Sequence, residues 1–116
     1  MGSSGYGSFG DLKKSPNNDL CKKAIEGVEL EEVARSEYYS ELNEVPPFMH
    51  LIEVKRELVN GRVVVISSEN QIIIGNLPSK YSYLLACMKQ GISYMGTVTY
   101  SVVNPIPRVM VDLNAE

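Results

Sequence analysis

The sequence predicts a small α+β domain built as a partly open five- or six-stranded β-barrel of the OB or SH3-like kind, packed with two helices. Short β-branched runs and alternating apolar positions fill the second half of the chain, whereas only two stretches repeat apolar residues at helical spacing. A chain of 116 residues supplies one modest core. We therefore expect a single domain over residues 21–116, preceded by a tail over residues 1–20.

The tail is predicted from its composition. Four of the nine glycines fall within the first ten residues, mixed with serines, and glycine loses more backbone entropy on ordering than any other residue. We expect a flexible segment whose aromatic residues, Tyr6 and Phe9, are its partner-binding groups. The run from Gly5 to Gly10 also fits the dinucleotide pattern G-x-G-x-x-G, but no strand precedes it and no apolar helix follows, so no cofactor is expected.

The first half of the domain should contain a helix and a strand. Apolar residues recur at helical spacing and predict a helix of two or three turns: Leu30, Val33, Ala34 and Tyr38. A short strand at Ile25 and Val28 could precede it. Pro46 and Pro47 forbid a continuing helix, so the chain should return to the core as a strand over residues 49–55.

The second half should begin with a hairpin and a helix. Two β-branched runs, residues 63–66 and 72–74, read as paired strands, with a tight turn at Asn60-Gly61 before them. Residues 79–90 form the clearest helix, capped by Ser79 and ended by Gly91.

Two strands should complete the domain. Apolar residues alternate from Ile92 to Val102, with a bend or bulge expected at Gly96, and again over residues 109–113.

Charge and cysteine content narrow the class of protein. Nine of the 14 acidic residues lie between Ala24 and Glu57, against three basic ones. No stretch approaches the roughly 20 apolar residues of a membrane-spanning helix, and the N-terminus lacks a secretory signal pattern. Two cysteines far apart in sequence indicate reduced thiols. We expect a cytoplasmic protein without a membrane partner.

Catalytic and metal-binding chemistry have few candidates. His50 is the only histidine, and Cys87 lies on the apolar face of a predicted helix, where burial makes a thiol inert. We expect no enzymatic activity, no catalytic residues and no metal site.

Nucleic-acid binding has a candidate surface. Aromatic rings stack on bases while cations contact phosphates, and residues of both kinds are near one another in sequence or could meet in the fold: Arg35, Tyr38, Tyr39, Arg62 and Lys80. The acidity of the same segment opposes a long phosphate-binding groove, so such a site should be small and local. Packing of the tyrosines in the core is the simpler interpretation.

Residues 60–113 resemble the second half of the HIRAN domain, a small β-barrel with helices that occurs alone in bacteria or attached to helicases. The similarity rests on Val63–Ile66, a turn, the junction Ile74-Gly75-Asn76-Leu77-Pro78, a helix ending at Gly91 and a long strand. The resemblance implies an OB-like barrel that binds single-stranded DNA, often at a 3′ end. Its binding residues sit in an Arg-Tyr-Tyr-like motif, here split as Arg35, Tyr38 and Tyr39, and in a loop that is here shortened to residues 57–62.

The first functional expectation is therefore a non-enzymatic binding module for single-stranded DNA or nucleic-acid ends. The alternative is a protein-interaction or self-assembling accessory domain, or a small-ligand-binding homo-oligomer. It rests on the doubly apolar hairpin strands and on the glycine-rich tail, because exposed apolar strands commonly pair with other chains.

Overall fold

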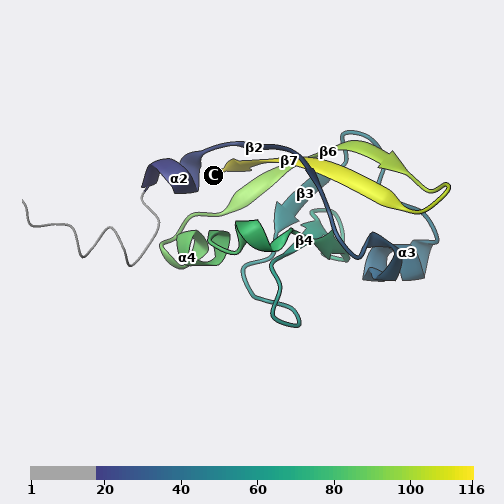
Figure 1. Ribbon diagram of the computed structural model, residues 1–116, viewed down its shortest axis with the longest axis horizontal. Coiled ribbons are helices and arrows are strands. Elements are labelled where there is room, and N and C mark those ends of the chain that lie inside the picture. The colour runs from purple at the N-terminus through teal and green to yellow at the C-terminus, as the bar shows by residue number, and fades with distance from the viewer. Residues whose placement is uncertain (1–17) are drawn as a thin grey trace, which may run out of the picture.

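The structure is a computed structural model that describes residues 18–116 (Figure 1). Its elements follow the chain as α2 Asn18–Lys22, β2 Ile25–Glu29, η1 Val33–Arg35, α3 Glu37–Leu42, β3 Leu51–Val54, β4 Val64–Ser67, β5 Ile73–Asn76, η2 Ser79–Tyr81, α4 Leu84–Lys89, β6 Tyr94–Val102 and β7 Arg108–Ala115. The expected class, α+β with a six-stranded sheet, is confirmed. Three short α-helices and two 3-10 turns surround the sheet where two helices were predicted.

All six strands belong to one antiparallel sheet in the order β2-β7-β6-β3-β4-β5. The sheet curls until the two outer strands approach each other, which makes a half-barrel around the core (Figure 1). Just beyond β2, Glu31 forms an isolated antiparallel bridge with Asn76 at the end of β5. The Glu31 and Asn76 amides each donate to the other residue's carbonyl at 2.8 Å. We call this two-hydrogen-bond contact the seam, because it joins the two outer strands of the sheet, β2 and β5.

The predicted hairpin and the later strands are present. β4 and β5 pair antiparallel, as do β6 and β7, and the Asn60-Gly61 turn forms with positive φ angles of 52° and 77° at its two residues. The bulge expected at Gly96 is displaced, since the register shift between β6 and β7 lies between Val98 and Tyr100. A Cβ at Gly96 would lie 1.7 Å from the Asp112 carbonyl oxygen, so glycine there permits close approach of the strands.

The predicted helix over residues 30–38 is wrong in its extent. The short strand expected at Ile25 and Val28 is present as β2. The helical part is divided into η1 and α3 at Ser36, whose backbone is extended at φ −71° and ψ 157°. The same apolar spacing arises because Leu30, Val33 and Tyr38 are all buried by the barrel rather than lying on one helix face. Ser79 also makes no side-chain capping bond, since η2 starts there after Pro78.

The expectation of reduced thiols is wrong. Cys21 and Cys87 form a disulfide that links α2 to α4, and both are fully buried. The hydroxyl of Tyr94, also buried, donates to the Cys21 carbonyl at 2.6 Å. α2 begins at Asn18, within the range expected to be tail, and the remainder of that range, residues 1–17, lies outside the described residues.

No helix within residues 18–116 combines the length and the apolar character needed to cross a bilayer.

Candidate functional site

A polar cavity of about 310 Å³ lies at the α3 end of the half-barrel, beside the seam. Three segments that are far apart in sequence form it: the corner between η1 and α3, the tight turn before β4, and strand β5. Its lining residues are Glu32, Arg35, Ser36, Glu37, Val59, Asn60, Val64, Ile73, Gly75 and Asn76. We call this space the seam cavity.

Local hydrogen bonds fix the corner that forms one wall of the seam cavity. The hydroxyl of Ser36 donates to the Val33 carbonyl at 2.7 Å and accepts from the Tyr39 amide at 3.1 Å. Ser36 is thus the N-cap of α3 and closes η1 at the same time. Ser36 is buried, with an exposed fraction of 6%, and its hydrogen bonds fix the backbone that places Arg35 at the cavity.

The opposite wall depends on the tight turn and on a glycine. Val59 and Arg62 exchange backbone hydrogen bonds of 2.9 and 3.0 Å across Asn60-Gly61, which presents Asn60 to the cavity. A Cβ at Gly75 would lie 3.0 Å from the Glu31 carbonyl oxygen, so a glycine lets the seam close. The glycine of the Ile74–Pro78 junction therefore lies within β5 and allows this strand to approach the backbone at Glu31.

Charges around the seam cavity are of both signs. Arg62 donates to the Glu31 carboxylate at 2.6 Å and to the Leu77 carbonyl at 2.8 Å, so its guanidinium is committed to holding the seam. The Glu37 carboxylate accepts from the Ile73 amide at 3.1 Å. Arg35 lies 3.6 Å from Glu32, but its side chain is 84% exposed, and such surface ion pairs contribute little. Arg35 is therefore the cation most available to a ligand.

The structure brings together only part of the predicted nucleic-acid site. Arg35 lines the seam cavity and Arg62 lies in the adjoining turn. Tyr38 is 6% exposed and packs in the core, while Tyr39 is half-buried against it. Lys80 is on η2, outside the cavity lining, with its Nζ 5.3 Å from the centroid of the Tyr81 ring.

Burial raises the pKa of the Tyr38 phenol, and the nearby carboxylates of Glu44 and Glu69 raise it further. This agrees with a tyrosine that is part of the core. The predicted partner-binding residues Tyr6 and Phe9 lie outside the described residues.

Of the ten lining residues, only Arg35 was among the predicted site residues. The neutral polar residues that were missed are Ser36, Asn60 and Asn76. The signals for two of them were visible but were given a purely structural meaning, because Asn60 was assigned to a turn and Asn76 to a strand junction. In the sequence, Ser36 lies between Arg35 and the tyrosines. In the structure, η1 ends and α3 begins at Ser36, so Arg35 lines the cavity while Tyr38 and Tyr39 lie on α3.

The residues considered for catalysis are engaged elsewhere. The His50 Nε2 atom lies 2.7 Å from the Ser67 hydroxyl, but Ser67 is fully buried, so that oxygen cannot reach a substrate. The Cys87 sulfur is covalently bonded to Cys21. Among residues 18–116, no three side chains from His, Cys, Asp and Glu are grouped so that they could hold a metal ion.

Comparison with protein-family models, with curated proteins and with solved structures finds no match to this chain.

Proposed function

We propose that this chain is a HIRAN-like, non-enzymatic binding module with an OB-like barrel, and that its seam cavity accepts an end of single-stranded DNA. One observation carries the proposal: the corner that holds Arg35 and the tight turn that holds Asn60 line the same cavity. The HIRAN resemblance implies binding residues in these two segments, which are separated in sequence. Their convergence supports the proposal independently of any aromatic motif.

The groups around the cavity suit bases better than a run of phosphates. Amide side chains at Asn60 and Asn76 can exchange hydrogen bonds with base edges. Arg35 can contact one phosphate or a guanine edge. Glu32 and Glu37, in the same lining, repel a longer phosphate backbone. The cavity is therefore suited to a terminal nucleotide. Tyr39 offers a partly exposed ring on α3, the helix that supplies Glu37 to the lining.

The test is fluorescence anisotropy of the full chain with short single-stranded DNA at low salt. We expect saturable binding that weakens when the free 3′ hydroxyl is replaced by a phosphate. Arg35→Ala should weaken binding about tenfold, because loss of a charged bidentate contact has a cost of that order. Lys89→Ala is the matched control, since it removes the same charge from an exposed position on α4. Absence of binding, or equal effects of the two variants, would contradict the proposal.

The disulfide provides a way to test the cellular compartment in which the protein resides. A cytoplasmic location was expected because the sequence shows no membrane-spanning stretch and no secretory signal pattern, whereas disulfides persist mainly in oxidising compartments. Thiol labelling of protein quenched directly from cells distinguishes the two cases. Free thiols at Cys21 and Cys87 would support the cytoplasm, and an oxidised pair would contradict it.

A further inference from the structure

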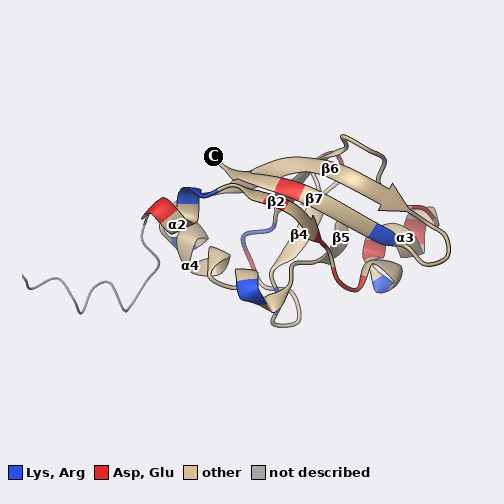
Figure 2. Cartoon of the chain, turned by 45° about the horizontal axis from the view of Figure 1, so that its top comes forward, with Lys and Arg blue, Asp and Glu red and all other residues tan. Residues whose placement is uncertain are grey.

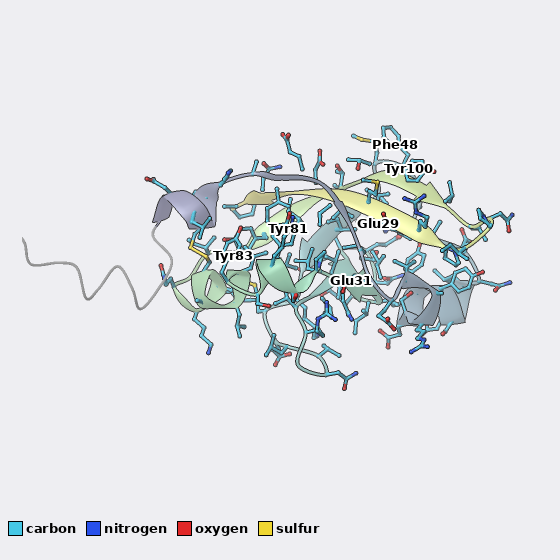
Figure 3. All side chains as sticks on the ribbon, viewed as in Figure 1. Glu29, Glu31, Phe48, Tyr81, Tyr83 and Tyr100 are labelled. Carbon is cyan, nitrogen blue, oxygen red and sulfur yellow. A yellow bond between two sulfur atoms is a disulfide. The ribbon has the colours of Figure 1, made fainter. Side chains whose placement is uncertain are left out.

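A second surface, on the outer face of β3 and β6, carries exposed apolar side chains. Phe48 is 68% exposed, Leu51 59% and Met49 57%, and Tyr100 and Met95 are 44% and 37% exposed. Phe48 and Tyr100 project close together on the β6 side of the sheet in Figure 3. We call these five residues the outer patch. It is separate from the seam cavity, because the two have no lining residue in common.

Strand register places the outer patch on one face of the sheet. β3 and β6 pair so that Leu51 is opposite Thr97 and Glu53 is opposite Met95. The Met49 amide donates to the Val98 carbonyl at 2.7 Å, which carries Phe48 alongside the part of β6 that leads to Tyr100. Side chains of the opposite orientation, such as Ile52 and Val98, are fully buried. The patch is therefore one outward face, and clustered exposed apolar side chains of this kind mark interaction sites.

A recess adjoins the patch at Leu51. It has a volume of about 370 Å³ and is lined by His50, Leu51, Ser68 and Glu69. The Ser68 hydroxyl oxygen is buried and has no hydrogen-bond partner among the described residues. A buried hydroxyl in this state favours an incoming group that can pair with it. The recess thus offers space for one side chain beside a free polar contact.

Acidic groups flank the outer patch. Glu53 faces Met95 across the strands, and Glu69 lines the recess. Arg108 has its guanidinium 5.8 Å from the centroid of the Tyr100 ring, but two hydrogen bonds of 2.9 and 3.0 Å commit it to Glu29. Figure 2 shows further acidic segments at α3. The fitting occupant is a segment with large apolar anchors and positive charge.

We propose that the outer patch binds the N-terminal segment of a second copy of this chain. Residues 1–17 contain two aromatic anchors, Tyr6 and Phe9, and two adjacent cations, Lys13 and Lys14, against one acid, Asp11. That composition matches the patch and its acidic surroundings in both respects. The segment enters the described structure at α2, at the end of the barrel farthest from α3 (Figure 1). Phe9 can lie at most about 30 Å from Asn18 when the chain between them is fully extended. Binding to a second copy does not require this segment to cross the length of its own half-barrel.

Sedimentation velocity over a wide concentration range tests the assembly. We expect the full chain to self-associate reversibly at micromolar concentrations. Deletion of residues 1–14 and the variant Leu51→Glu should each weaken association at least tenfold. The deletion removes no described residue, and Leu51 is largely exposed, so melting temperatures should stay near that of the parent. Leu58→Glu is the matched control, because Leu58 is 45% exposed outside the patch and its change should leave association intact.

A peptide experiment identifies the occupant. A labelled peptide of residues 4–15 should bind the chain that lacks residues 1–14, and the Phe9→Ser peptide should bind at least tenfold more weakly. A full chain that stays monomeric at hundreds of micromolar would overturn the proposal, as would association that survives the deletion. A peptide that binds equally well to the Leu51→Glu chain would also overturn it. DNA binding through the seam cavity is unaffected by any of these outcomes, so the two proposals fail separately.

Discussion

The two ends of the half-barrel are held together by different means. At the α2 end, a disulfide and the fully buried hydroxyl of Tyr94 tie the first helix to the core. At the α3 end, the sheet is closed by the Glu31–Asn76 bridge and by the ion pair of Arg62 with Glu31. The covalent end is a fixed scaffold, whereas the polar end depends on a few solvent-accessible contacts. The candidate binding cavity lies at the end that can adjust most easily.

Removal of the disulfide should have the largest effect among the changes that test this difference between the two ends. Closure of a chain segment with a sequence separation of 66 residues restricts the unfolded state, and the chain-entropy relation gives a loss of about 4 kcal/mol for the Cys21→Ala/Cys87→Ala variant. Urea unfolding monitored by circular dichroism measures it. Under native conditions the variant should still bind DNA like the parent, because the seam cavity is at the other end. Loss of DNA binding in a folded variant would contradict the separation of the two ends.

Gly96→Ala tests the β6–β7 ladder that both ends share. The new Cβ would meet the Asp112 backbone at 1.7 Å from its oxygen and 2.7 Å from its carbonyl carbon. Backbone cannot yield as a flexible side chain does, so we expect a loss of about 3 kcal/mol. The same unfolding experiment should show this destabilisation, and fluorescence anisotropy should show weaker DNA binding. A loss below about 1 kcal/mol would mean that the two strands lie farther apart than described.

Gly75→Ala tests the α3 end, where the seam closes the sheet. The added Cβ would lie 3.0 Å from the Glu31 oxygen and 3.2 Å from Cγ2 of Val33, contacts that a small shift can relieve. Strain and the stiffer unfolded chain offset each other in part, so the net loss should be about 1 kcal/mol. Because the shift occurs in the cavity wall, DNA affinity should fall more than it does in the disulfide variant. The reverse ranking in anisotropy would count against the assigned cavity.

The smallest effect concerns pH. A side-chain hydrogen bond from Arg108, helped by its charge and opposed by slight burial, lowers the pKa of Glu29 below its ordinary value of 4.5. A carboxyl with a depressed folded-state pKa stabilises the fold above its unfolded pKa, and this contribution is lost as the pH falls through the folded value. The melting temperature of Glu29→Gln should therefore fall less steeply below pH 4.5 than that of the parent. Glu26→Gln, at an exposed position on the same strand, should follow the parent curve.

Local patterns predicted much of this fold. The hairpin at residues 63–74, the turn at Asn60-Gly61 and the long strand after Gly91 each depend on neighbouring residues, and each is present. The helix over residues 30–38 was wrong in its extent because curling of the sheet buries the same apolar residues although they do not lie on one continuous helix. Periodicity reports which residues are buried and leaves open what buries them.

Long-range contacts could not be predicted in this way. The bond between Cys21 and Cys87, the seam between Glu31 and Asn76, and the cavity shared by Arg35 and Asn60 all join segments that only the folded sheet brings together. Of the predicted DNA-binding residues, Arg35 alone lines the cavity. Tyr38 was chosen for its ring, and it is the ring that the core has buried.

The pairing of β2 with β7 determines where the two ends of the described chain lie. Ile25 is the register partner of Leu113, and the Glu116 amide donates to the Ser93 carbonyl at 2.7 Å. Both ends of the described chain therefore meet beside α2 (Figure 1). A domain that followed Glu116 would begin at this end of the half-barrel, whereas the seam cavity lies at the other end. The seam cavity would therefore face away from such a domain and remain accessible to a ligand.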